Sequence, residues 1–156
     1  MKGPQSTAIT TVERRLDVYT QDPSWQRLWI CLEPQNWRSL VLVPAGRDSS
    51  IDVVNGLAGV AWQQRGGRVI VADLRTISLP ALGNARMALR KRIEDGDRIL
   101  IAISALDVNP TSTAIAREAD RAVVCVFAGR AERAQVRSIV RELGPQRCLG
   151  SILVTP

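Results

Sequence analysis

Histidine is absent from this chain of 156 residues, and cysteine is scarce. Without histidine the commonest general base of enzymes is missing, so hydrolases that use a Ser-His-Asp or Cys-His arrangement are excluded. The three cysteines, Cys31, Cys125 and Cys148, are widely spaced and form no C-x-x-C pair. Together with the missing histidine, this leaves too few ligands for a zinc site. We expect the cysteines to be buried thiols in a reducing compartment.

Long hydrophobic runs are also absent. No apolar stretch approaches the length that crosses a membrane, and residues 1–20 lack the apolar core of a signal peptide. We therefore expect a cytoplasmic protein without membrane insertion. Hydrophobic residues make up 46% and charged residues 23% of the chain, which is typical of a globular domain. The pattern predicts a flexible leader over residues 1–23, with a turn around 12–18, and a single α/β domain over residues 24–156.

Short apolar runs alternate with segments of helical spacing along this domain. The runs lie at residues 39–43, 68–72, 98–103, 121–127 and 149–154. None alternates cleanly with polar residues, and continuous apolar runs are typical of strands that are buried on both faces of a parallel sheet. The order of strands and helices predicts a doubly wound α/β fold. We expect a mainly parallel sheet of five strands, or slightly more, flanked by helices.

An aromatic helix is predicted before the first strand. Trp25, Leu28 and Trp29 lie at helical spacing, and Ser24 is the expected N-cap. Tryptophan is enriched at interface hot spots, so the two tryptophans are candidates for binding a partner. The other interpretation, which we favour, is that they pack the helix onto the sheet. Of the four tryptophans in the chain, we expect Trp37 to be the most exposed.

Positive charge is carried almost entirely by arginine. Two of the 21 basic residues are lysines, and the formal net charge is +6. Arginine forms forked contacts with carboxylates and phosphates, so one interpretation is an anionic partner, either an acidic protein surface, nucleic acid or an anionic membrane face. The other is a solvated surface, and composition alone does not choose between them. Four arginines align on one flank of the last predicted helix: Arg130, Arg133, Arg137 and Arg141. This flank either contacts an acidic partner or lipid headgroups, or is a solvated helix face that Glu132 and Glu142 partly offset.

The first apolar run leads through residues 44–50, Pro-Ala-Gly-Arg-Asp-Ser-Ser, into a helix, which is the context of a phosphate-binding loop. The segment 55–58, Asn-Gly-Leu-Ala, looks like the start of the first helix of ParA/MinD-type ATPases. Residues 116–130 resemble a signature of one branch of that group, the cytoplasmic tyrosine-kinase domain of bacterial capsule and exopolysaccharide export. The final run, 149–154, is similar to the last strand of this family. The resemblance spans residues 24–154 and implies a P-loop NTPase-like fold, trimmed between Asp73 and Asp97.

The loop lacks the cation that this family uses. The family wraps the phosphates of ATP with backbone N–H groups, neutralises them with a lysine and holds Mg²⁺ with a serine or threonine. This loop keeps Gly46, Ser49 and Ser50, but the only lysines of the chain are Lys2 and Lys91. Arg47 precedes the lysine position and is only a partial substitute. A degenerate loop of this kind predicts that no nucleotide cofactor is bound.

The family's metal-binding carboxylates are also depleted. Asp73 matches one of the two aspartates of a D-x-D motif; depending on the alignment, Arg75 replaces the other or the first aspartate is lost. Ala102 stands where the resemblance implies an aspartate of the Mg²⁺ shell. The only tyrosine is Tyr19, whereas the kinases carry a C-terminal tyrosine cluster. We therefore expect a pseudokinase with no catalytic residues and no bound metal.

The resemblance implies a non-catalytic regulatory or scaffold subunit of bacterial polysaccharide synthesis and export. Its partner would be the cytoplasmic part of a membrane polysaccharide co-polymerase, or a related export protein, which would hold the chain at the inner face of the plasma membrane. Candidate partner-binding residues are Trp25, Arg27, Trp29, Arg130, Arg133, Arg137 and Arg141. Of the Glu-x-x-Arg-x-x-Arg pattern that joins the kinases into rings, only Arg27 remains. Homo-oligomerisation of another kind stays open.

Three alternatives remain at this stage. One is a degenerate ParA/MinD-like positioning factor for a pilus or secretion system, which would dimerise without nucleotide. Another is a residual nucleotide sensor that uses Gly46, Arg47 and Asp73. The basic charge also raises nucleic-acid binding, but the sequence contains no helix-turn-helix or aromatic stacking motif to support it.

Overall fold

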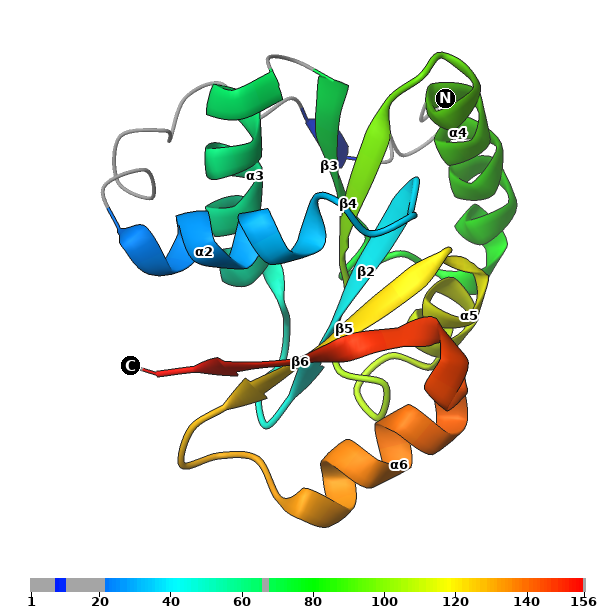
Figure 1. The fold of residues 1–156 in the computed structure, drawn as a ribbon. Coiled ribbons are helices and arrows are strands. Elements are labelled where there is room, and N and C mark those ends of the chain that lie inside the picture. Colours follow the sequence, from blue (N-terminus) through cyan, green and yellow to red (C-terminus); the bar gives the residue numbers. More distant parts are fainter. Residues whose placement is uncertain (1–7, 11–21, 66–67, 156) are drawn as a thin grey trace.

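The computed structural model describes residues 8–10, 22–65 and 68–155. Six strands form one sheet between two layers of helices (Figure 1). The strands are β1 (Ala8–Thr10), β2 (Ser39–Ala45), β3 (Val69–Asp73), β4 (Arg98–Ala102), β5 (Arg121–Phe127) and β6 (Cys148–Val154). Their order is β1-β3-β4-β2-β5-β6, and the five strands from β3 to β6 in this order are parallel. The predicted doubly wound α/β fold is confirmed.

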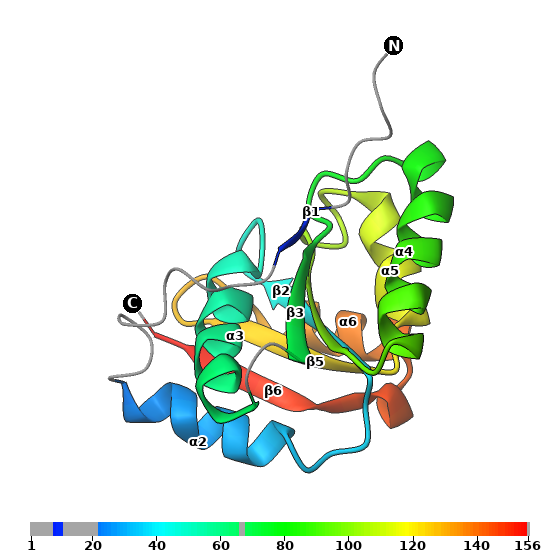
Figure 2. The same cartoon turned by 90° about the horizontal axis from the view of Figure 1, so that it is seen from above.

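Helices cover both faces of the sheet, as Figure 2 shows. One layer consists of α2 (Pro23–Leu32) and α3 (Ile51–Arg65), and the other of α4 (Leu82–Glu94), α5 (Pro110–Glu118) and α6 (Arg133–Leu143). Two short 3₁₀ turns, η2 (Leu79–Ala81) and η3 (Pro145–Arg147), lie before α4 and after α6.

The central strand β2 is buried along its whole length. Leu40 and Leu42 contribute to the core beneath α2 and α3, whereas Val41 and Val43 contribute to the core on the opposite face. The side chains therefore do alternate in direction. Because each face is covered by helices, both sets must be apolar, and this is why the sequence of the strand shows no polar alternation.

Helix α2 begins one residue before the predicted cap. Asp22 is the N-cap, and its carboxylate accepts a hydrogen bond from the N–H of Ser24 at 2.9 Å, so the cap expected at Ser24 is wrong. Pro23 occupies the first turn, where its missing N–H costs nothing. Trp29 is completely buried and meets Trp37 edge to face, with ring centroids 6.1 Å apart. The packing interpretation of Trp29 is therefore confirmed.

Trp37 is buried, contrary to our expectation, with only 3% of its surface exposed. Its indole N–H donates to the carbonyl of Leu32 at 2.8 Å, and the guanidinium of Arg98 stacks 3.7 Å from a ring centroid. Arg98, the first residue of β4, also donates to the carbonyls of Glu33, Gln35 and Trp37 at 3.0 to 3.1 Å. Arg98 therefore stacks on Trp37 and, from this position, joins β4 to the segment that follows α2.

Strand β6 lies at one edge of the sheet as described and is only half-buried, so the expectation of burial on both faces is wrong for this run. Leu153 remains 68% exposed, since β6 has β5 as its one neighbour. The cysteines also differ from the expectation. Cys125 is buried, which raises the pKa of its thiol, but Cys148 is half-buried and Cys31 is exposed on α2.

The opposite edge carries a strand that the sequence did not predict. β1 pairs antiparallel with β3, with Ile9 opposite Ala72. It lies within the expected flexible leader, and the turn predicted around residues 12–18 falls outside the described residues. The unpaired N–H and C=O groups at the edge of a sheet readily bind a further strand. The edge of β3 can therefore hold residues 8–10 as a strand, although their own sequence does not predict one. Among the described residues, no helix has the length and apolar character needed to cross a membrane.

The contact between α2 and α3 depends on a glycine. A methyl group at Gly56 would lie 2.7 Å from three atoms of the Trp25 ring, far inside van der Waals contact. We expect Gly56→Ala to lower the free energy of unfolding by about 1 to 2 kcal/mol, because overpacking outweighs the gain in helix propensity. Urea denaturation measures this change. Gly83→Ala is the matched control, since nothing lies within 4 Å of the added methyl group in α4, and it should be neutral or stabilising.

A double substitution identifies the cause. When Trp25 is replaced by alanine, the space beside residue 56 opens, and adding Gly56→Ala in that background should no longer destabilise the protein. Equal effects of Gly56→Ala with and without Trp25 would contradict the close packing of these two helices.

Candidate functional site

The predicted loop residues and Asp73 come together at the carboxyl edge of the parallel sheet. The loop at residues 46–50 follows β2, Asp73 ends β3, and Ala102 ends β4. Ala102 is paired with Asp73 on one side and with Leu42 on the other, so the three strand ends are neighbours. Ligands of parallel α/β folds bind at this edge, where successive connections leave toward opposite faces. β2 is such a point, because α3 lies on one face and α5 on the other.

On the β5 side, the loop is in direct contact with another backbone. Gly46 has a φ of +87°, a conformation that favours glycine. A Cβ atom at this position would lie 2.6 Å from the carbonyl carbon of Arg130 and 2.7 Å from the nitrogen of Ala131. The turn after β5 therefore packs against the loop without a gap. At Gly46, the backbone of the loop thus lies directly against the backbone of residues 130–131.

On the β4 side, the loop pairs with the segment that follows β4. The N–H of Ser50 donates to the carbonyl of Ile103 at 3.2 Å, and the carbonyl of Asp48 accepts from the N–H of Ala105 at 2.9 Å. An isolated antiparallel bridge joins Ser49 to Ser104 between these two bonds. A phosphate-binding loop needs its N–H groups free to point at the phosphates. Here the N–H of Ser50 is already used within the protein.

The hydroxyl of Ser50 is turned inward as well. Ser50 is completely buried, and its Oγ accepts a hydrogen bond from the N–H of Ile103 at 3.3 Å. In the family that the sequence resembles, a serine or threonine of this loop would hold Mg²⁺. In this arrangement the hydroxyl instead joins the start of α3 to the end of β4.

Arg47, the cation of the loop, has partners of its own. Its guanidinium lies 5.4 Å from the centroid of the Phe127 ring, a cation–π distance, and its Nη1 is 3.7 Å from Oδ2 of Asp52. The side chain remains 45% exposed. Its charge is therefore partly offset by a carboxylate before any ligand is considered.

Asp73 is held by Arg75 through both carboxylate oxygens. Nε of Arg75 donates to Oδ1 and Nη2 donates to Oδ2, each at 2.8 Å. This hydrogen bonding lowers the pKa of Asp73, against the smaller opposing effect of burial. The hydroxyl of Ser104 and the amide of Asn109 donate to the carbonyl of Arg75, at 2.7 and 3.3 Å, and so fix the backbone of the arginine. A guanidinium thus occupies both oxygen atoms with which the carboxylate would bind a metal or its water.

Ala102 completes the picture at the end of β4. Its side chain is fully buried in the core beneath α2 and α3, and its carbonyl accepts a hydrogen bond from Leu74 at 2.9 Å. Within the described part of the chain, no three or more histidine, cysteine, aspartate or glutamate side chains are grouped as metal ligands. The sequence located this edge correctly but missed the Asp73–Arg75 pair. Its signal was the Asp-x-Arg spacing at the end of a buried strand.

The candidate partner-binding residues differ in how much of their surface is exposed. Trp29 offers no surface to a partner, and Trp25 is half-buried against α3, whereas Arg27 is exposed. Arg133, Arg137 and Arg141 lie on α6, but Arg130 lies in the turn before it, so the predicted alignment of four arginines on the helix is wrong for Arg130. All four are exposed, and we call them the arginine ridge: Arg130, Arg133, Arg137 and Arg141. None of them forms an ion pair with another described residue. Glu142, expected to offset them, instead accepts a hydrogen bond from Arg117 at 2.6 Å.

Comparisons with protein-family models, with curated proteins and with solved structures find no match to this chain. The resemblance to the polysaccharide-export kinases therefore stays a prediction from the residues quoted above.

The Asp73–Arg75 pair makes a prediction about pH. In Arg75→Gln, we expect the pKa of Asp73 to rise, because the main cause of its lowering is removed while burial remains. A lowered carboxyl pKa stabilises the fold at pH values above the unfolded pKa of about 4, and this stabilisation is lost at lower pH. Arg75→Gln should therefore cost on the order of 1 kcal/mol at pH 7, and less near pH 3. Urea denaturation at both pH values measures this difference.

Arg47→Gln is the matched control for this prediction. It removes the same charge at the same edge of the sheet, but its contact with Asp52 is long and exposed. Its effect on stability should be small and nearly independent of pH. If the two variants lose equal stability at pH 7 and retain the same loss at pH 3, the Asp73–Arg75 pair is not the stabilising contact described here.

Proposed function

We propose that this chain is a pseudokinase that serves as a non-catalytic regulatory or scaffold subunit in bacterial polysaccharide synthesis and export. The observation that carries the proposal is the closed loop at residues 46–50. It lies where a P-loop fold binds phosphate, yet its surroundings are filled by the backbone of residues 103–105 and 130–131. The polysaccharide context comes from the similarity of residues 116–130 to the export kinases.

Phosphoryl transfer requires free backbone donors, a cation and a metal ion at one place. Each requirement meets an obstacle in this chain. The N–H of Ser50 is donated to a carbonyl, no lysine lies in the loop, and the carboxylate of Asp73 is bound by Arg75. If one of these three obstacles were removed, the other two would still prevent phosphoryl transfer. This combination supports a protein that acts through partners and does not turn over ATP.

The arginine ridge is the surface best suited to such a partner. Its guanidinium groups are exposed and have no ion pairs among the described residues, and the whole chain carries a net charge of +6. Arginine binds carboxylates with a forked geometry, so an acidic segment in the cytoplasmic part of a membrane polysaccharide co-polymerase, or of a related export protein, is the expected partner. Binding there would place this chain in the cytoplasm at the inner face of the plasma membrane.

Two alternatives use the same fold. A degenerate ParA/MinD-like positioning factor would localise to a pilus or secretion pole independently of any polysaccharide genes. A residual nucleotide sensor is favoured by one observation, the 45% exposure of Arg47 beside Gly46. Nucleotide binding would then require the loop to separate from residues 103–105, which breaks two backbone hydrogen bonds.

Calorimetric titration with ATP and ADP, with and without Mg²⁺, tests the closed loop. We expect no Mg²⁺-dependent heat, no Mg²⁺-dependent thermal shift at millimolar nucleotide and no transfer of the γ-phosphate, because the N–H of Ser50 and the carboxylate of Asp73 are already occupied and the loop has no lysine. Binding at micromolar affinity that requires Mg²⁺ and disappears in Arg47→Ala would reverse this assignment. The chain would then be a nucleotide sensor.

Affinity purification from membranes tests the partner. The tagged chain should recover a polysaccharide co-polymerase, and the double reversal Arg133→Glu and Arg137→Glu should reduce recovery about tenfold or more, because charge attraction becomes repulsion. The double reversal Arg90→Glu and Lys91→Glu is the matched control, since both residues are exposed on α4 and lie outside the ridge. Recovery that contains no membrane polysaccharide component, or that survives the double reversal, would count against the proposal.

A further inference from the structure

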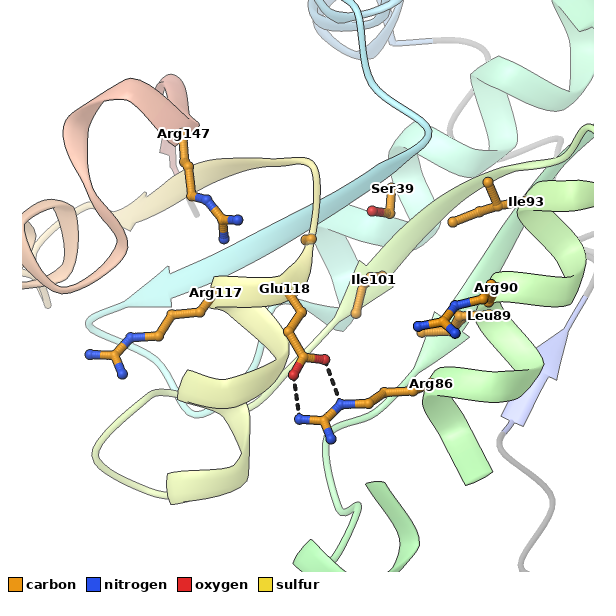
Figure 3. Close-up of a pocket in the computed structure, with 10 residues that line it drawn as sticks. Ser39, Arg86, Leu89, Arg90, Ile93, Ile101, Arg117, Glu118 and Arg147 are labelled. Atoms are coloured by element: carbon orange, nitrogen blue, oxygen red, sulfur yellow. Dashed lines mark hydrogen bonds and ion pairs between the residues drawn. The ribbon is translucent and has the colours of Figure 1, made fainter. Parts of the chain in front are cut away.

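A pocket lies near the amino ends of the parallel strands, whereas the loop lies at their carboxyl ends. Its volume is about 590 Å³, within the range of about 300 to 1,000 Å³ that is usual for small-molecule sites. Ser39, the first residue of β2, and Ala119, just before β5, mark its position at the amino ends of the strands. Figure 3 shows the walls formed by α4, by the end of α5 and by η3. The pocket is separate from the carboxyl edge, where this fold class usually binds ligands.

The floor of the pocket is apolar. It consists of Leu89 and Ile93 from α4, Ile101 from β4, and Ala119. Ile101 and Ala119 are only 2% and 4% exposed, and the two residues of α4 are half-buried. An aromatic or aliphatic group placed here would bury apolar surface against these side chains.

The rim of the pocket is basic, with four arginines against one carboxylate. Glu118 accepts two hydrogen bonds from Arg86, which Figure 3 marks with dashed lines, so this pair is balanced internally. Arg117 donates to Glu142 at 2.6 Å. The remaining two arginines, Arg90 on α4 and Arg147 on η3, have no ion pair with any described residue.

The two unpaired arginines come from different walls. Figure 3 shows Arg90 extending from α4 on one side and Arg147 from η3 on the other. A cleft lined by charge of one sign concentrates its electric field and attracts counter-ions. Guanidinium groups bind phosphate with paired, charge-assisted hydrogen bonds. An anionic group that enters the pocket would therefore meet a guanidinium without an ion pair on either wall.

Two other pockets on the molecule lack this character. One, between α5 and α6, is lined by Asp107 and Glu142, and the other, between α2 and β6, by Asp22. Neither has an arginine in its lining. The combination of an apolar floor with unpaired arginines therefore distinguishes the pocket at the amino edge from these two.

We infer that this pocket binds a small phosphorylated molecule, with its phosphate at the rim, where Arg90 and Arg147 have no ion pair, and an aromatic or apolar body on the floor formed by Leu89, Ile93 and Ile101. This site is independent of the closed loop and needs no metal ion. The inference does not rest on the proposed role in polysaccharide export.

The test uses 1-naphthyl phosphate as the probe. Its binding to the full chain is measured by fluorescence and by calorimetry. We expect saturable binding with one site per chain. Inorganic phosphate, which lacks the apolar body, and 1-naphthol, which lacks the charge, should each bind about tenfold more weakly or worse. Equal binding of 1-naphthol and 1-naphthyl phosphate would overturn the role of the arginines.

Two pairs of variants locate the site. Arg90→Gln and Arg147→Gln should each weaken binding about tenfold, whereas Lys91→Gln, the same charge change at an adjacent position outside the lining, should leave it unchanged. Glu118→Gln on α5 should strengthen binding several-fold because it releases Arg86. Glu94→Gln on α4, which lies outside the lining, should leave binding unchanged. The changed side chains are exposed or half-buried, so unchanged melting temperatures will confirm folding.

Binding that is absent in the wild-type chain, or that falls equally in Arg90→Gln and Lys91→Gln, would overturn the inference. Failure here would leave the closed loop untouched, because that region is tested by Mg²⁺-dependent nucleotide binding and by the Arg47→Ala variant.

Discussion

At the end of β2, the chain must turn into α3 while its neighbours on both sides turn the other way. In a phosphate-binding protein this turn surrounds an anion, and the ligand supplies the acceptors for its N–H groups. Here residues 48–50 instead pair with residues 103–105, and the turn after β5 closes the other side. The buried start of α3, the inward hydroxyl of Ser50 and the close approach at Gly46 all follow from this internal pairing. The turn therefore finds hydrogen-bond partners within the protein, where a phosphate-binding loop would find them in its ligand.

The same substitution of protein for ligand occurs at Asp73. A carboxylate at the end of a buried strand needs a positive partner, since desolvation disfavours its charge. A divalent ion would meet this need in an enzyme, and Arg75 meets it here with two hydrogen bonds of 2.8 Å. Because the arginine is covalently part of the chain, the carboxylate is neutralised at all times. The charge of Asp73 is therefore offset without a bound metal ion.

The general architecture was predictable because it depends on patterns of apolar residues that are close together in the sequence. Continuous apolar runs identify strands covered on both faces, and the stripe around Trp29 identifies a helix that packs inward. What failed depended on position within the sheet or on contacts between distant segments. The run at residues 149–154 looks like any buried strand but occupies an edge, and Trp37 is buried because Arg98, 61 residues later, stacks on it. Similarly, the loop is closed by hydrogen bonds to residues about 50 positions away, and the basic pocket gathers arginines from α4, α5 and η3.

Gly46 has a structural reason to be glycine that involves no ligand. In a phosphate-binding loop, glycine permits backbone N–H groups to approach a ligand. In this protein the residue adopts a positive φ and leaves no room for a Cβ beside Arg130, so backbone conformation and packing alone favour glycine here. A glycine at this position is therefore no evidence of an ATP site by itself. The resemblance described above would also require a lysine in the loop and a carboxylate at position 102, and this sequence has neither.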